Sequence, residues 1–109
     1  MFSFLQDMDN YEERKVDRYE KDDLIIDTCF ASDIGKYETA IQHPQYDKGK
    51  WIITEEYETE SLAKIGHEKW VKIMTSEKLP GKLINVSSAC AISILRDCFN
   101  ENLEHEKTD

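Results

Sequence analysis

Apolar and polar residues alternate along three segments of the chain before a helical pattern takes over. These segments are Leu24–Phe30, Tyr37–His43 and Trp51–Tyr57, and turn-forming residues separate them. Alternation with a period of two is typical of β-strands that bury one face. Arg14–Tyr19 fits a fourth strand, because it is short and charged, as edge strands tend to be. We therefore expect an antiparallel meander of three or four strands with one face in water.

The next segment has apolar residues at helical spacing. Thr59 is a suitable N-cap for a helix that runs to Met74. The apolar stripe of this helix consists of Leu62, Gly66, Trp70 and Ile73, with Ala63 and Met74 beside them. Glycine costs about 1 kcal/mol relative to alanine inside a helix, so Gly66 indicates close approach to another element. We expect Trp51 and Ile53 to lie beneath the helix, which makes both of them, with the helical stripe, the residues that define the core.

The pattern is weaker beyond the main helix. Leu83–Val86 is short enough to be a further strand, and Ser87 or Ser88 can cap a second helix that ends near Asn100. Large apolar residues of this second helix are Ile94, Leu95 and Phe99. Residues 101–109 are polar, and we expect them to form a flexible tail. The expected fold class is α+β, with one main helix on one face of the sheet and a C-terminal helix.

The length of 109 residues predicts a single domain, which we place at residues 13–100. Residues 1–12 form an N-terminal arm that could dock on the domain, dock on another subunit or stay disordered. Apolar residues near chain ends are a marker of association. We therefore take those of the arm and of the second helix as the candidate interaction surface, with docking inside one subunit as the alternative. The arm contributes Phe2, Phe4 and Leu5, and the helix contributes Ile94, Leu95 and Phe99.

Composition adds that the chain is acidic, with a formal net charge of -9. Such a surface repels phosphate backbones, so direct binding of nucleic acid is not expected. Its acidity serves solubility, and it also suits a basic partner or mimicry of nucleic acid. No apolar run is long enough for a signal peptide or a membrane span. Cys29, Cys90 and Cys98 are odd in number and lack CxxC spacing, which favours reduced thiols in a cytoplasm.

No sequence motif demands a reaction. His43, His67 and Cys29 could form a metal site or a nucleophile with its base. No closely spaced ligand pair, such as CxxC or HxxxH, supports either reading. We expect His67 to border the sheet and bond a neighbouring strand, and His43 to belong to the turn with Tyr46. No catalytic, cofactor-binding or metal-binding residue is therefore expected.

Glutamates around the end of the last strand are the other chemical candidate. Alternation places Glu55 and Tyr57 on one face of the strand, and Glu56 and Glu58 on the opposite face. Two nearby carboxylates could divide acid and base roles. A solvated strand end has the same sequence, and exposed acids are the norm. We favour solvated carboxylates, including that of Glu60 at the start of the helix.

The chain resembles a family of small proteins of unassigned activity that tailed phages and prophages of Gram-positive bacteria encode. The resemblance covers about residues 14–86. It is carried by YET at 37–39, by His43-Pro44 with Tyr46, by WIITEEYET at 51–59 and by GHEKWV at 66–71. It implies a phage origin, a bacterial host cytoplasm and, more weakly, a place among virion or assembly genes. It offers no catalytic residues that could be transferred to this chain.

Three functional hypotheses follow. The first is a non-catalytic virion structural or assembly component that acts as a homo-oligomer or docks on other phage proteins. The second is an acidic inhibitor of a host or defence protein, or a mimic of nucleic acid, because residues 1–30 contain nine acidic and four basic residues. The third is an enzyme of hydrolase type that uses Cys29, His43 or His67. We favour the first.

Overall fold

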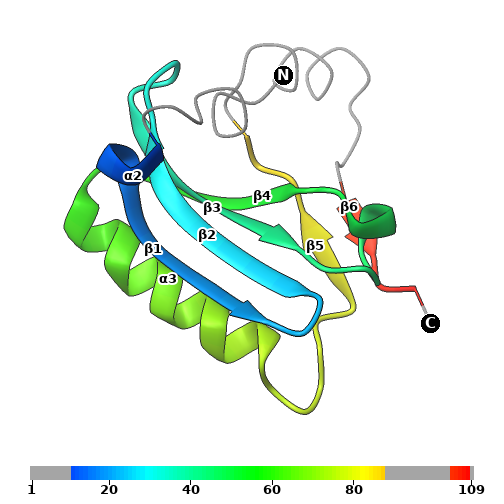
Figure 1. The fold of residues 1–109 in the computed structure, drawn as a ribbon. Helices are drawn as coiled ribbons and strands as arrows, with labels where there is room; N and C mark the ends of the chain where they lie inside the picture. Colours follow the sequence, from blue (N-terminus) through cyan, green and yellow to red (C-terminus); the bar gives the residue numbers. More distant parts are fainter. Residues whose placement is uncertain (1–10, 88–103, 109) are drawn as a thin grey trace, which may run out of the picture.

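The computed structural model describes residues 11–87 and 104–108 and arranges them in an α+β fold (Figure 1). An antiparallel sheet holds four strands in chain order, β1 (Lys15–Lys21), β2 (Leu24–Ala31), β3 (Lys36–Gln42) and β4 (Ile52–Tyr57). Helix α3 (Glu60–Met74) crosses one face of this sheet (Figure 1). The expected meander with one main helix is confirmed, and so is the N-cap, because Thr59 Oγ1 accepts a hydrogen bond from the Leu62 amide at 3.2 Å.

Smaller elements flank the sheet. Helix α2 (Tyr11–Arg14) precedes β1, and the 3-10 turn η2 (Asp47–Gly49) precedes β4. Strands β5 (Lys82–Ile84) and β6 (Glu104–Glu106) form a separate antiparallel pair. The next two amides, of Lys107 and Thr108, donate to backbone carbonyls at 2.8 and 2.7 Å. Residues 104–108 of the expected flexible tail are therefore paired with other parts of the chain. Backbone hydrogen bonds hold them, and the charged side chains of this segment do not predict such bonds.

Several expectations fall on residues that the structure does not describe. The second helix, expected from Ser87 or Ser88 to Asn100, lies almost wholly outside the described residues. So does the whole candidate interaction surface, which comprises Phe2, Phe4, Leu5, Ile94, Leu95 and Phe99. Those expectations stay predictions.

A β-bulge decides which residues of β4 face the helix. Thr39 of β3 pairs with Glu55, whereas the next residue, Ala40, pairs with Ile53. Thr54 is therefore an extra residue in β4, and a bulge of this kind reverses the alternation of side chains along a strand. Residues before and after Thr54 must be assigned to faces separately.

The bulge makes one expectation about the core wrong. Ile52 joins the apolar cluster that packs against α3, whereas Ile53 packs with Cys29 and Trp51 in a second cluster. Ile53 is buried as expected, but it lies with Trp51 on the face away from the helix. That face was expected to lie in water, yet Cys29 and Ile53 are at most 1% exposed. Alternation alone cannot reveal an inserted residue, so it placed Trp51 and Ile53 on the wrong side.

The cluster under the helix is the main core. Its buried members are Leu24, Ile26, Ile41, Tyr46, Ile52, Met74 and Leu83. Trp70 and Ile73 are partly buried and pack against it, as the helical stripe predicted. Leu62 does not, because it is 50% exposed. The stripe is rotated from the expected one. Ala63, which was expected beside the stripe, and His67 face the sheet in place of Leu62, since hydrogen bonding rather than hydropathy buries the histidine.

Gly66 allows the helix to approach the sheet, as its position predicted. It is buried in α3, and a Cβ atom added there would overlap the phenol ring of Tyr57. The neighbour is thus Tyr57 of β4, beyond the bulge, and not Trp51 or Ile53.

Candidate functional site

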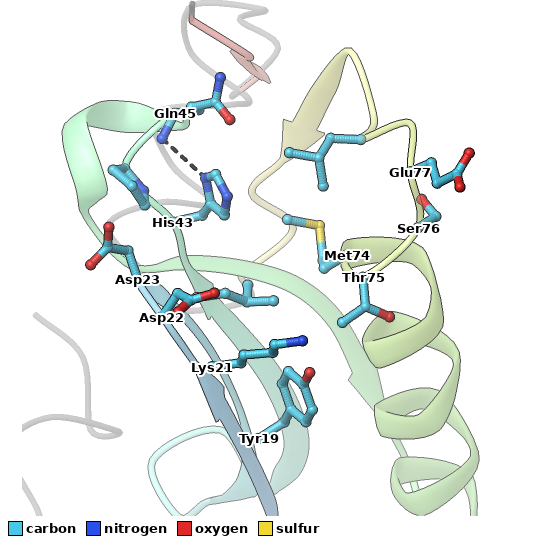
Figure 2. A pocket seen from close by; sticks show the side chains of 13 residues that line it. Tyr19, Lys21, Asp22, Asp23, His43, Gln45, Met74, Thr75, Ser76 and Glu77 are labelled. Atoms are coloured by element: carbon cyan, nitrogen blue, oxygen red, sulfur yellow. Dashed lines mark hydrogen bonds between the residues drawn. The ribbon is translucent and has the colours of Figure 1, made fainter.

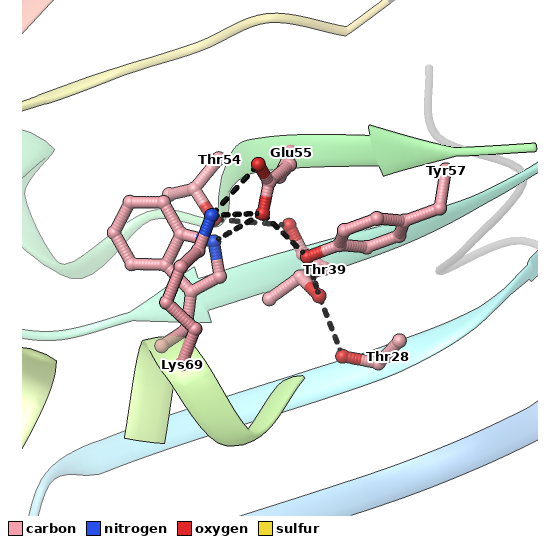
Figure 3. A network of polar contacts seen from close by, with 7 residues as sticks. Thr28, Thr39, Thr54, Glu55, Tyr57 and Lys69 are labelled. Atoms are coloured by element: carbon pink, nitrogen blue, oxygen red, sulfur yellow. Dashed lines mark hydrogen bonds and ion pairs between the residues drawn. The ribbon is translucent and has the colours of Figure 1, made fainter. Parts of the chain in front are cut away.

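A chain of buried hydrogen bonds crosses the sheet beneath α3 (Figure 3). Thr28 Oγ1 on β2 lies 2.6 Å from Thr39 Oγ1 on β3, which lies 3.0 Å from the Tyr57 hydroxyl on β4. The Tyr57 hydroxyl donates to the Glu55 carboxylate at 2.9 Å. Thr28 and Thr39 are fully buried. A hydroxyl group can donate and accept hydrogen bonds at the same time. This series of hydrogen bonds therefore satisfies polar groups whose burial in a core would otherwise cost free energy.

His67 attaches the helix to this chain. Its Nδ1 atom lies 2.7 Å from Thr28 Oγ1, and its Nε2 atom lies 3.8 Å from a carboxylate oxygen of Asp17 on β1. The side chain is nearly buried, and burial lowers the pKa of His67, although Asp17, Glu68 and Asp27 act in the opposite direction. The expectation that His67 bonds a neighbouring strand is confirmed. Its role in the structure is to hold α3 on β2.

Glu55 closes the chain at the other end. Its carboxylate accepts a hydrogen bond from Trp70 Nε1 at 3.0 Å, and Lys69 Nζ lies 2.6 Å from one oxygen and 2.8 Å from the other. Burial alone would raise the pKa of Glu55, but hydrogen bonds from Lys69, Tyr57 and Trp70 bring it below its usual value. The expectation of a solvated carboxylate is wrong for Glu55. Trp70 offered a signal, because a half-buried indole N–H needs an acceptor.

The structure does not bring the three candidates for covalent chemistry together. Cys29 follows Thr28 on β2, so its side chain lies on the sheet face opposite to His67. Burial is the main cause that raises the pKa of Cys29 to about 12, and the negative charge of Asp27 is the second. The thiol therefore stays protonated at neutral pH. Among residues 11–87 and 104–108, no cluster of three or more His, Cys, Asp or Glu side chains could hold a metal ion.

His43 lies in the loop after β3, as expected. Its Nδ1 atom accepts a hydrogen bond from the Gln45 amide at 3.1 Å, and its ring meets that of Tyr46 edge to face with centroids 5.4 Å apart. Tyr46 is fully buried, and its hydroxyl donates to the Pro80 carbonyl at 2.5 Å. The expected association of His43 with Tyr46 in this turn is confirmed.

Sequence reasoning missed a perturbed carboxyl group on the far face of the sheet. Glu38 pairs with Cys29 on one side and with Glu56 on the other. It is only 4% exposed, and burial raises its pKa to about 7, with Glu56 and Asp33 adding to the rise. The sequence shows that Glu56 is acidic, but it does not show the strand register that places Glu56 beside Glu38.

Among the residues that the structure describes, large apolar side chains are exposed at two places. On the outer side of α3, Leu62 is 50% and Ile65 is 67% exposed. Beyond the helix, Ile84 of β5 is 44% exposed. It borders an apolar groove of about 350 Å³, whose lining residues are Thr54, Trp70, Ile73, Pro80, Lys82, Leu83, Ile84 and Val86. Surfaces of this kind suit contacts with other macromolecules.

Within the described part of the chain, no helix has the length and apolar character needed to cross a membrane. Comparison with protein-family models, with curated proteins and with solved structures finds no match to this chain.

Proposed function

We propose that this chain is a non-catalytic phage protein that acts in virion structure or assembly, by self-association and by docking on other phage proteins. The resemblance of residues 14–86 supports the phage origin and the bacterial host cytoplasm as the place of synthesis. The observation that carries the self-association is apolar surface on the outer side of α3, where Leu62 and Ile65 are 50% and 67% exposed.

The positions of the reactive side chains support a binding role. His67 is hydrogen-bonded from α3 to β2, Tyr57 is hydrogen-bonded from β4 to β3, and Cys29 is a buried thiol on the opposite face. These groups stabilise the fold. None of them lies on the outer side of α3 with Leu62 and Ile65, and none lines the apolar groove beside Ile84.

Leu62 and Ile65 form the surface that we assign to self-association. They are three residues apart on a helix, which makes them neighbours on its surface. Burial of an apolar side chain of this size in an interface stabilises the complex by about 1.5–3 kcal/mol. A second copy of the chain, related by a twofold axis, could cover both residues with its own pair.

Sedimentation equilibrium tests the self-association. We expect the wild-type protein to form an oligomer and Ile65→Glu to shift the equilibrium to the monomer. Lys64→Glu is the matched control, because Lys64 is exposed on the neighbouring position of the same helix. A wild-type protein that stays monomeric at high concentration would contradict this part of the proposal.

Purified phage particles test the place in the virion. Mass spectrometry should detect the chain in particles if it is a structural component. If it is an assembly factor, particles should lack it, and deletion of its gene should prevent their formation. A gene position between capsid and tail genes would agree with either role. Normal particles without the chain, from a phage with the gene deleted, would contradict both.

The alternative is an acidic inhibitor of a host or defence protein. The observation in its favour is the group of carboxylates at the β1–β2 turn and just beyond α3, formed by Asp22, Asp23 and Glu77. A strict monomer that binds a basic host protein and inhibits it would favour this function over a role in assembly.

A further inference from the structure

Strand β1 forms one edge of the four-stranded sheet (Figure 1). Among the strands that the structure describes, it pairs with β2 alone. Most residues of β1 are exposed, and only Val16 and Tyr19 are partly buried. An edge strand presents amide and carbonyl groups to which a further strand can bind. The sequence of β1 decides which strand fits there.

The backbone groups of Arg18 and Glu20 point to this edge. A two-residue turn joins Lys21 to Leu24, and a turn of this kind makes the two residues that flank it a hydrogen-bonded pair. Hydrogen-bonded pairs recur at every second residue of an antiparallel ladder. Arg18 and Glu20 therefore direct their amides and carbonyls away from β2. The Arg18 amide agrees with this, because it donates to the Asp17 carboxylate at 2.8 Å.

The last five residues of β1 are complementary to themselves in the antiparallel direction. They read Asp-Arg-Tyr-Glu-Lys. When two copies pair around a twofold axis at Tyr19, Arg18 lies opposite Glu20 of the second copy. In the same register, Asp17 lies opposite Lys21 of the second copy. Both pairs join opposite charges, and opposite charges at directly opposed positions stabilise an antiparallel ladder.

The faces of the sheet agree with this register. Side chains alternate along a strand, so Asp17, Tyr19 and Lys21 lie on the α3 side, and Arg18 and Glu20 lie on the far side. Figure 2 shows the side chains of Tyr19 and Lys21 extending from β1 toward the end of α3, where both line a pocket of about 520 Å³. Residues that pair across the axis thus share a face, as an antiparallel ladder requires.

Arg18 is held in position for such a contact. Its guanidinium group lies 2.5 Å from the carboxylate of Asp27, which is buried on β2. Its Nε atom lies 2.7 Å from Glu20 of the same copy. Pairing around the axis places two of these Arg18–Glu20 pairs side by side, so that four charges alternate in sign.

Other registers are unfavourable. A slide that moves the axis to Arg18 places two arginines opposite each other, and a slide that moves it to Glu20 places two glutamates opposite each other. Like charges at directly opposed positions are destabilising. A slide of a single residue puts the paired side chains on different faces. The charges of β1 therefore select the register centred on Tyr19.

We propose that β1 pairs with β1 of a second copy of the chain and joins two four-stranded sheets into one continuous sheet. The inference rests on the proposed self-association and adds a second contact to the one at Leu62 and Ile65. On pairing, the Arg18 amide exchanges the Asp17 carboxylate for the Glu20 carbonyl of the second copy. Exposed ion pairs contribute little individually, so this contact is weak on its own and a cross-link is needed to detect it.

A disulfide cross-link tests the contact and its register. Tyr19 faces its own copy in a non-hydrogen-bonded pair, whose Cα atoms are about 4.5 Å apart, within the range for disulfides. Tyr19→Cys is combined with Cys90→Ser and Cys98→Ser, which remove other thiols, and with Ile65→Glu, which weakens the α3 contact. In a glutathione buffer we expect covalent dimers. The matched control Glu20→Cys should give almost none, because its Cα atoms lie more than about 7 Å apart in this register.

Charge reversal tests the ion pairs directly. Lys21→Glu places acids opposite each other in a dimer of identical copies, and Asp17→Lys places bases opposite each other. A mixed dimer of these two variants restores opposite charges at both positions. When the two variants, each with Tyr19→Cys, are mixed in equal amounts, mixed dimers should exceed random pairing by about three-fold or more, as expected for two exposed ion pairs. Mass spectrometry distinguishes the dimers by mass.

Three results would overturn the proposal. The first is a lack of covalent dimers from a Tyr19→Cys protein that circular dichroism shows to be folded. The second is equal cross-linking of Glu20→Cys, and the third is random pairing in the mixture. All are measured with Ile65→Glu present, so failure of the β1 contact leaves the contact at α3 standing. A wild-type protein that sediments as a monomer, with Tyr19→Cys still cross-linking, would contradict the α3 contact alone.

Discussion

Glu38 and Glu56 lie directly opposite each other on β3 and β4, on the sheet face away from α3. Burial, with further contributions from Glu56 and Asp33, raises the pKa of Glu38 from 4.5 to about 7. A raised carboxyl pKa means that folding favours the protonated form. The free energy of unfolding should therefore be highest below pH 4.5 for this group and fall as the pH rises through about 7.

The variant Glu38→Gln isolates this effect. Glutamine keeps the shape and removes the charge, so we expect it to stabilise the protein at pH 8 by up to about 3 kcal/mol, since one pKa unit corresponds to about 1.4 kcal/mol. At pH 5 the difference should be much smaller, because most of the loss between pH 4.5 and about 7 has not yet occurred. Urea denaturation at both pH values measures this, with Glu58→Gln as the control. The same difference at pH 5 and pH 8 would show that Glu38 does not titrate as described.

His67 predicts the opposite slope at lower pH. Burial lowers its pKa from 6.5, although Asp17, Glu68 and Asp27 oppose this, so folding favours the neutral imidazole. Stability from this group is present above pH 6.5 and is lost as the pH falls through the folded pKa. We expect His67→Gln to lower stability at pH 7.5 and to flatten the loss below pH 6.5. The measurement is best made in the Glu38→Gln background, which removes the competing titration.

Gly66→Ala should destabilise the protein although alanine is the better helix former. The added methyl group would overlap the Tyr57 ring, and overpacking of this kind costs about 1–3 kcal/mol. Thermal denaturation should show a lower Tm for Gly66→Ala and little change for Gly81→Ala, where a Cβ meets no atom within 4 Å. Combining Gly66→Ala with Tyr57→Leu should cost less than the sum of the two single changes. Strict additivity would mean that the two residues do not touch.

Glu55→Ala should weaken the attachment of α3. It removes the acceptor of Trp70 Nε1 and one of the two partners of the Tyr57 hydroxyl, and an unsatisfied buried group costs about 1–3 kcal/mol. Glu55→Gln keeps an acceptor oxygen and should cost less. The fluorescence of Trp70, recorded in a Trp51→Phe background, should change in Glu55→Ala and stay constant in the control Glu58→Ala. Unchanged fluorescence and stability would contradict the described role of Glu55.

The sequence was sufficient for the meander and the main helix. Periods of two and of helical spacing follow from backbone geometry, so the strand expected at Tyr37–His43 was predictable to within one residue at each end, and the helix after Thr59 was predictable to its last residue. The close approach at Gly66 was predictable as well, because a glycine inside a helix calls for an explanation.

The remaining features depend on register, which periodicity does not contain. One inserted residue, Thr54, moved Ile53 to the far face, and neither its presence nor its position shows in the pattern. The same limit hid the pairing of Glu38 with Glu56. Leu62 was misplaced because hydropathy ranks it above His67, whereas the hydrogen bond to Thr28 makes histidine the residue to bury.

The order of strands in the sheet also bears on how quickly the chain can fold. Each of β1 to β4 pairs with its neighbour in the chain, so no long loop has to close before the next strand can add. Local pairing of this kind is associated with rapid folding. Strands β5 and β6 lie farther apart in the chain than the other paired strands. We expect them to pair late, after the β1–β4 sheet and α3 have formed on the ribosome or shortly after release.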